Sequence, residues 1–172
     1  MKARVVVIGV GLAVIGCNKN PAGPLPGVSS SCSATLSGAL SGTYDCRPAT
    51  TTWSSFDNTG AFTFAVNPSG SRPAISVPIV WDSEPATRTY SNTDLVAEAD
   101  ISVQTSTNQI WRARVGTGAA PTGSYSLTFT SIVANLTSPS GLGYSAEGTL
   151  SATLTPVASS GATGTLTLTA TF

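Results

Sequence analysis

From residue 32 onward, apolar and polar residues alternate along the chain with a period of two. Successive side chains of a β-strand point to opposite faces, so this period indicates strands with one buried face. The stretch 75–81 is the clearest, because Ile75, Val77, Ile79 and Trp81 share one parity. Similar alternation predicts strands at 32–46, 49–56, 61–66, 95–104, 109–115, 125–133, 144–154 and 166–172, separated by turns rich in Gly, Pro, Asn and Ser.

No segment of this region has the 3.6-residue period of an amphipathic helix. Eight or nine short strands joined by tight turns are typical of an all-β fold. We therefore predict an antiparallel β-sandwich of about 8–9 strands, with a small closed β-barrel as the alternative. Residues 32–172 form a single domain, and a domain of roughly 150 residues is long enough to bury a hydrophobic core.

The three tryptophans fall on the apolar parity of their strands. This position favours a place in the core for Trp53, Trp81 and Trp111 over a sugar-stacking platform. If residues 57–60 form the hairpin turn, Trp53 lies opposite Phe64 and both face the core. The turn has oxygen donors but lacks the further acids of a calcium loop, so an ordinary hairpin turn is the better interpretation.

Four charged residues belong to the predicted hairpin of 95–104 with 109–115, namely Glu98, Asp100, Arg112 and Arg114. Because the apolar residues of both strands face the core, these four side chains share the outer face. One permitted register pairs Asp100 with Arg112 and Glu98 with Arg114. Cross-strand pairs contribute about 0.2–1 kcal/mol each, so we expect a surface ion-pair ladder that fixes the register more than it stabilises the fold.

Cys32 and Cys46 are an isolated pair of thiols within the domain. In an oxidising compartment they are expected to form a disulfide, and closing a loop of about 15 residues stabilises a fold by roughly 3 kcal/mol. The alternation, however, also fits one unbroken strand from 32 to 46, whose ends would lie far beyond bridging distance. A reversal of the chain at Gly38 or Gly42 removes this conflict, and we favour the disulfide.

Residues 1–17 have the organisation of an export signal. Lys2 and Arg4 are basic, residues 5–15 are apolar, and Gly16 is a small residue at the end of the segment. The apolar run is too short for a membrane-spanning helix, which needs about 20 residues. Its glycine pattern is similar to a dinucleotide-binding turn, but a Pro/Gly linker follows where that site needs a helix.

The four residues Val14-Ile15-Gly16-Cys17 resemble the lipobox of bacterial lipoproteins. The resemblance implies that the signal peptide 1–16 is removed and that the Cys17 thiol is lipidated. Residues 17–31 then form a flexible Pro/Gly/Ser tether, and in that family Asn18 after the cysteine favours the outer membrane. The stretch 37–46 is also similar to the opening strand of β-rich envelope lipoproteins of Gram-negative bacteria, a similarity that implies no activity.

The composition excludes several classes of function. The chain contains no histidine, which removes Ser-His and Cys-His catalysis and the commonest metal ligand. Removal of Lys2 and Arg4 with the signal leaves six cations against eight anions, a balance that predicts no nucleic-acid partner. We expect no metal and no cofactor.

Carboxylate chemistry is the remaining enzymatic option. Asp82 with Glu84, and Glu98 with Asp100, have an i, i+2 spacing that is compatible with a glycosidase pair. The first pair lies in a loop after a strand, and the second pair has arginines to face. We therefore predict that the protein is not an enzyme.

Taken with the lipobox resemblance, these features predict a lipid-anchored protein of the cell envelope, at the outer membrane, that acts as a non-enzymatic binding or surface module. Its expected partners are the membrane, through the acyl anchor, and a protein or glycan ligand. A carboxylate-based glycan hydrolase is one alternative. An outer-membrane β-barrel is another, because residues 164–172 alternate up to Phe172 as the last strands of such barrels do, although charges on the outer face would be costly against lipid.

Overall fold

Strands account for the regular structure of this computed structural model, which describes residues 31–46, 49–54, 56–66, 73–94, 97–116, 120–138 and 141–172. The eleven strands of this part of the chain are accompanied by one 3-10 turn, η1 (Ala158–Ser160). The strands are β1 (Ser33–Gly38), β2 (Gly42–Asp45), β3 (Thr50–Ser54), β4 (Thr59–Val66), β5 (Ala74–Trp81), β6 (Thr89–Ser91), β7 (Ala97–Gln104), β8 (Ile110–Val115), β9 (Ser124–Ser138), β10 (Gly141–Pro156) and β11 (Leu166–Thr171).

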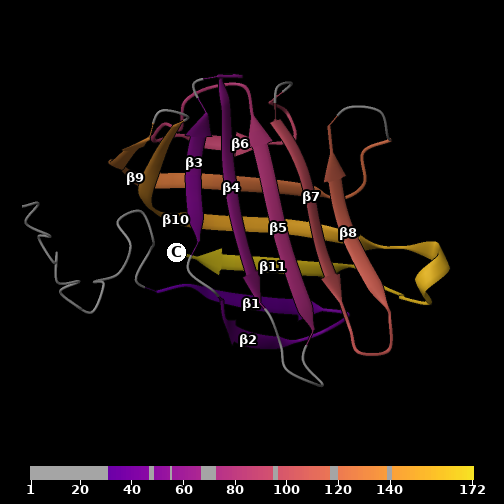
Figure 1. Ribbon diagram of the computed structural model, residues 1–172. Helices are drawn as coiled ribbons and strands as arrows, with labels where there is room; N and C mark the ends of the chain where they lie inside the picture. Colours follow the sequence, from indigo (N-terminus) through magenta and orange to yellow (C-terminus); the bar gives the residue numbers. More distant parts are fainter. Residues whose placement is uncertain are drawn as a thin grey trace, which may run out of the picture.

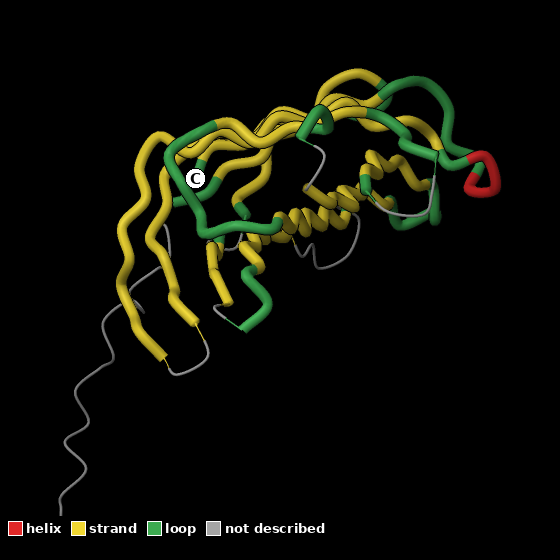
Figure 2. The backbone as a smooth tube through the Cα atoms, turned by 90° about the horizontal axis from the view of Figure 1, so that it is seen from above, coloured by secondary structure: helices red, strands yellow, loops and turns green. Residues whose placement is uncertain are grey.

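The strands form two layers that face each other. Strands β3, β4, β5, β7 and β8 are neighbours in one layer, and β2, β1, β11, β10, β9 and β6 are neighbours in the other. The strands of the two layers cross steeply (Figure 1), and the view turned by 90° shows one layer above the other (Figure 2). All of the pairings between named strands are antiparallel. The predicted all-β antiparallel sandwich is confirmed.

Strand β10 connects the two layers because each of its two ends pairs with a strand of the other layer. Near its start, Leu142 lies opposite Trp53 of β3. At its end, Thr155 lies opposite Arg112 of β8. The β9–β10 register shifts twice along the way, and such irregularities bend a strand. The bend at Gly148 depends on glycine, since a Cβ there would collide with a backbone carbonyl of β9.

The space between the layers is filled by apolar side chains of alternating residues. Its largest group is a cluster of aromatic rings in mutual contact, formed by Phe62, Phe64, Trp81, Tyr90, Phe129 and Phe172. Trp111 is also buried, and its Nε1 donates a hydrogen bond to the carbonyl of Gly164 at 3.0 Å. The core positions predicted for Trp81 and Trp111 are therefore confirmed.

The described chain has eleven strands where about 8–9 were predicted, and two differences account for the larger number. The predicted segment 32–46 divides into β1 and β2, because the chain reverses between Gly38 and Gly42. Strand β6 was not predicted, since three residues are too short to show alternation. Within the described residues, no helix is long and apolar enough to cross a membrane.

Candidate functional site

The predicted lipidation site lies outside the described residues. Cys17, the signal peptide 1–16 and the greater part of the tether 17–31 fall in residues 1–30. Cys17 therefore stays a prediction from the lipobox resemblance. The described chain begins at Ser31, directly before the first half-cystine.

Cys32 and Cys46 are joined by a disulfide, as favoured from the sequence. The β1–β2 hairpin brings their Cα atoms to 5.0 Å from each other, and the Cys46 N–H donates to the Cys32 carbonyl at 3.0 Å. Gly38 has a φ of +101°, a conformation that glycine adopts without strain. The chain therefore reverses at one of the positions that the sequence offered, and the conflict with one continuous strand disappears.

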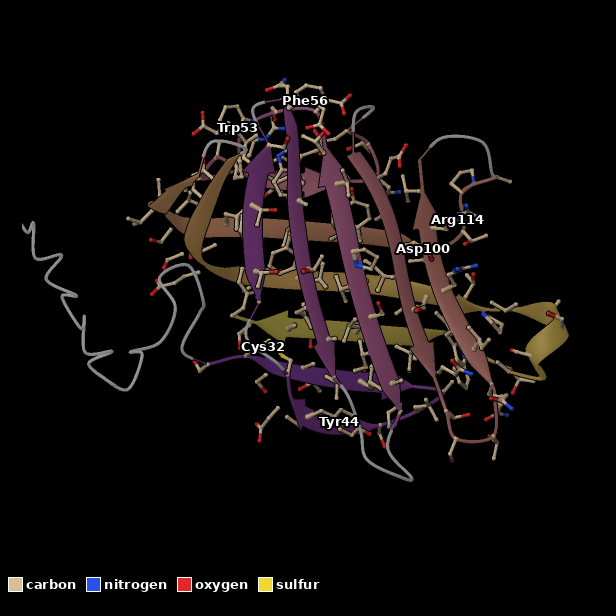
Figure 3. The ribbon with its side chains drawn as sticks, viewed as in Figure 1. Cys32, Tyr44, Trp53, Phe56, Asp100 and Arg114 are labelled. Carbon is tan, nitrogen blue, oxygen red and sulfur yellow. A yellow bond between two sulfur atoms is a disulfide. The ribbon has the colours of Figure 1, made fainter. Side chains whose placement is uncertain are left out.

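The charged residues of β7 and β8 lie on the outer face of their layer (Figure 3). Arg112 forms a bidentate ion pair with Asp100, donating from Nε and, at 2.9 Å, from Nη2. The predicted register is wrong by two residues, because Asp100 lies opposite Arg114 and Arg112 lies opposite Ser102. The Arg112–Asp100 contact is consequently diagonal, a geometry that a long side chain can reach. In this register the backbone of Glu98 does not lie opposite Arg114, so the predicted second rung is not formed by directly opposed residues.

Two of the carboxylates that were considered for catalysis, Glu84 and Asp100, have structural partners. Glu84 accepts a hydrogen bond from the hydroxyl of Tyr144 at 2.5 Å. Burial, assisted by the hydrogen bond to Glu84 and its charge, raises the pKa of Tyr144 well above its usual value. Asp82 contributes its backbone carbonyl to a contact with Asn58. In the described part of the chain, no three His, Cys, Asp or Glu residues are placed to hold a metal ion.

The β3–β4 turn differs from the prediction, and the difference places an aromatic residue in solvent. The turn lies between Ser54 and Thr59, two residues earlier than expected, so Trp53 faces Gly60 instead of Phe64. Trp53 is only half-buried as a result. Phe56, which was expected in a strand, lies in the turn with 97% of its surface exposed. Both side chains lie at the same end of the molecule (Figure 3).

Hydrogen bonds hold this turn in place. Asn58 adopts the left-handed conformation with a φ of +54°, which asparagine tolerates better than most residues. Its Oδ1 accepts a bond from Trp53 Nε1 at 3.4 Å, and its Nδ2 donates to the Asp82 carbonyl at 3.0 Å. The Asp57 carboxylate accepts from the Thr59 N–H at 3.3 Å. We call Trp53, Phe56, Asp57, Asn58 and Asp82 the aromatic corner.

Hydrogen bonding also favours the charged form of Asp57 in the aromatic corner. A hydrogen bond from the Ser54 side chain is the largest cause of a lowered pKa of the exposed Asp57 carboxyl; burial opposes it, and bonds from Thr59 add to it. Asp57 is ionised at neutral pH even at its ordinary pKa of 3.8, and these bonds favour its charged form further. The corner combines two aromatic rings with at least one fixed negative charge and an amide, which is a set of groups suited to recognition.

The outer face of the second layer carries hydroxyl groups in rows. The register places Ser and Thr residues side by side across the strands, and we call these rows the hydroxyl face. The rows are Ser33–Thr171–Thr149–Thr128–Thr89, Thr43–Thr35–Thr169–Ser151–Ser126–Ser91 and Ser37–Thr167–Thr153–Ser124. Two neighbouring pairs bond directly, Thr35 with Thr43 at 3.1 Å and Thr89 with Thr128 at 2.9 Å. A shallow hollow of about 350 Å³ lies over the middle of this face.

Sequence reasoning missed Phe56 and Asn58 as residues of a candidate site. The pair Asp57-Asn58 was a usable signal, because both residues favour turns and asparagine tolerates the left-handed region. With the turn centred on that pair, Phe56 would have been expected outside the strand. The chain matches no protein-family model, no curated protein and no solved structure.

Proposed function

We propose that this protein is a lipid-anchored envelope protein that acts as a non-enzymatic binding module. In this proposal Cys17 carries the acyl anchor, residues 17–31 are the tether, and the β-sandwich of 32–172 presents a binding surface to the surrounding water. The outer membrane is the proposed location, as Asn18 favours in lipoproteins of this kind.

The disulfide between Cys32 and Cys46 is the observation that carries the proposal. Structural disulfides form and persist in oxidising compartments and are rare in the reducing cytosol. The bridge lies at the start of the domain, one residue after the proposed tether ends. A covalent clamp at that position suits a domain that is held by its N-terminus.

The distribution of polar groups supports a water-exposed domain. Most of the apolar side chains of the described strands lie between the two layers, and the hydroxyl face is exposed on the outside. A transmembrane barrel needs the opposite arrangement, with an apolar band facing outward. Phe172, whose terminal position favoured that alternative, packs instead against Phe62 and Phe129.

The carboxylates weigh against a glycan hydrolase. Such an enzyme needs one acid that donates a proton and a second that acts as base or nucleophile, placed on either side of the substrate. Asp100 is engaged by Arg112, and Glu84 accepts a hydrogen bond from Tyr144. A binding role requires no change in the contacts of these two carboxylates.

Acylation of Cys17 is the feature that tests the proposal. The full chain is expressed in a Gram-negative host with an alkyne fatty acid, and the product is analysed by intact-mass and peptide mass spectrometry. We expect cleavage before Cys17, the mass of an acylated cysteine, and no label on a Cys17→Ser variant. Recovery of an unlipidated chain that retains residues 1–16 would overturn the proposal.

A further inference from the structure

We propose that the aromatic corner is a glycan-binding site, in which Phe56 and Trp53 stack on the apolar face of a pyranose ring. The proposal deepens the function proposed above, because it names the ligand class of the binding module. Four properties of the aromatic corner support the proposal: the exposure of its aromatic residues, the hydrogen bonds that hold its turn, its size and its charge.

The exposure of Phe56 is not explained by the fold. Burying a phenylalanine side chain contributes roughly 1.5–3 kcal/mol, and Phe56 at 97% exposure forgoes almost all of it. A single exposed apolar residue is ordinary, but here a second ring, that of the partly buried Trp53, lies at the same end of the molecule (Figure 3). The ring of Phe56 and the part of Trp53 that remains exposed are available to a ligand.

The turn is held in place before any ligand arrives. Asn58 links Trp53 to the turn through Oδ1 and links the turn to the β5–β6 loop through the carbonyl of Asp82. A rigid turn loses little conformational entropy on binding, so contacts with its rings convert efficiently into affinity.

The size of the corner suits a small ligand. A phenylalanine and a tryptophan bury about 150–250 Å² each when fully covered. A stable protein interface needs about 800 Å² on each partner, so these two rings alone fall short of it. A pyranose ring matches the size of one aromatic side chain and offers both C–H groups for stacking and hydroxyl groups for hydrogen bonds.

The charges of the corner favour a sugar over a phospholipid surface. Asp57 and Asp82 are exposed acids, and interfacial membrane sites are enriched in Lys and Arg instead. Arg88, in the β5–β6 loop that also contains Asp82, contacts the ring of Tyr90, with its guanidinium carbon 4.2 Å from the ring centroid. Its charge is thus engaged by an aromatic ring of the protein. Carboxylates and the Asn58 amide can accept hydrogen bonds from sugar hydroxyls and would repel anionic headgroups.

Tryptophan fluorescence offers a direct readout. Trp81 and Trp111 are buried in the core, so a change in emission on ligand addition reports on Trp53. The protein, purified in detergent in the form in which the host produces it, is titrated with cellohexaose and with chitohexaose, and the affinity is measured independently by calorimetry. We expect saturable binding of at least one hexasaccharide and an emission change that disappears in Trp53→Phe.

Substitutions at Phe56 separate stacking from general surface effects. Phe56→Ala is expected to weaken binding by roughly tenfold or more, while Phe56→Tyr keeps the ring and retains the affinity. Val133→Ala truncates another exposed apolar residue, on β9, and is the matched control that should bind like the wild type. Equal affinity of Phe56→Ala and wild type, or no binding of either hexasaccharide, would overturn the proposal.

A membrane role gives a different result. In vesicles that contain brominated phospholipid, insertion of the corner would quench Trp53 emission, and that result would also overturn the proposal. The lipidation experiment is independent of these titrations. Failure to acylate Cys17 with normal sugar binding would overturn the lipid-anchored function proposed above but not the glycan site, and acylation without sugar binding would overturn only the glycan site.

Discussion

Arg112 binds Asp100 across the β7–β8 pair, although the residue opposite Asp100 in the register is Arg114. The pair is formed diagonally, by reaching over two residues along the strand. Both side chains remain about two-fifths exposed, at 43% for Arg112 and 37% for Asp100. Water therefore screens the interaction, and its contribution to stability is modest.

Arg112→Ala is expected to lower the free energy of unfolding by about 0.2–1 kcal/mol, because it removes a bidentate but exposed ion pair. Arg114→Ala is the matched control, since it removes the same kind of side chain from the same strand without touching that pair. Urea denaturation at low and at molar salt measures both, and the difference between the variants should shrink at high salt. A larger loss of unfolding free energy for Arg114→Ala than for Arg112→Ala would show that Asp100 pairs with Arg114, the residue directly opposite it.

The disulfide is expected to matter more than the ion pair. The double variant Cys32→Ser, Cys46→Ser opens a bridge between residues 14 positions apart, and the chain-entropy model gives a loss of roughly 3 kcal/mol. Guanidinium denaturation of the double variant measures the loss. Both proteins are also unfolded with and without reductant as a control. Reduction should destabilise the wild type as much as the double substitution does, and it should not change the stability of the double variant.

Alternation along the sequence predicted which faces are buried, but not the registers. A slip of one residue exchanges the buried and exposed faces, whereas a slip of two or four preserves them. Both register errors are of the second kind: Arg112 is displaced by two positions, and Trp53 faces Gly60 instead of Phe64. Apolar periodicity cannot distinguish such registers, because the same side chains face the core in each.

The hydroxyl face and the aromatic corner differ in how much of each could be predicted from the sequence. The outward threonines of residues 165–171 follow from parity alone, but the rows of the hydroxyl face need the strand order, which places β11 between β1 and β10. The aromatic corner depends on the position of one turn and on contacts of Asn58 with another loop. Contacts between distant loops leave no local signal in one sequence.

Gly60 is expected to tolerate no side chain. A Cβ at this position would collide with the indole of Trp81 and approach the carbonyl of Ser83 at 2.6 Å. Gly60→Ala should therefore destabilise the fold by about 1–3 kcal/mol through overpacking. Gly143→Ala is the matched control, because a Cβ there meets nothing within 4 Å and should be neutral or slightly stabilising. Thermal unfolding compares the two, and equal midpoints would contradict the close packing of Gly60.

Stability is expected to fall at alkaline pH through Tyr125. Burial, and to a lesser extent the charge of Asp94, raise the pKa of Tyr125 to about 12 from a usual value of 10.0. The folded state holds the phenolic proton more tightly than the unfolded state does. The stabilisation is therefore complete below pH 10.0 and is lost as the pH rises toward about 12.

Tyr125→Phe checks this dependence because it keeps the ring and removes the ionisable group. Urea unfolding at a series of pH values should show a shallower alkaline decline for the variant than for the wild type. Near neutral pH the two proteins should differ by less than about 1.5 kcal/mol, since the ring packing is conserved. Parallel alkaline curves would assign the decline to other groups.

Phe172 and Phe56 offer the same substitution in two opposite environments. Phe172 is 7% exposed, its ring centroid lies 4.6 Å from that of Phe62, and its backbone exchanges two hydrogen bonds with Gly148. Phe172→Ala should therefore cost about 3–5 kcal/mol, whereas Phe56→Ala at 97% exposure should stay within about 0.5 kcal/mol of the wild type. Urea denaturation measures both. A small effect of Phe172→Ala would contradict the place of that ring in the core of the sandwich, and a large one supports it.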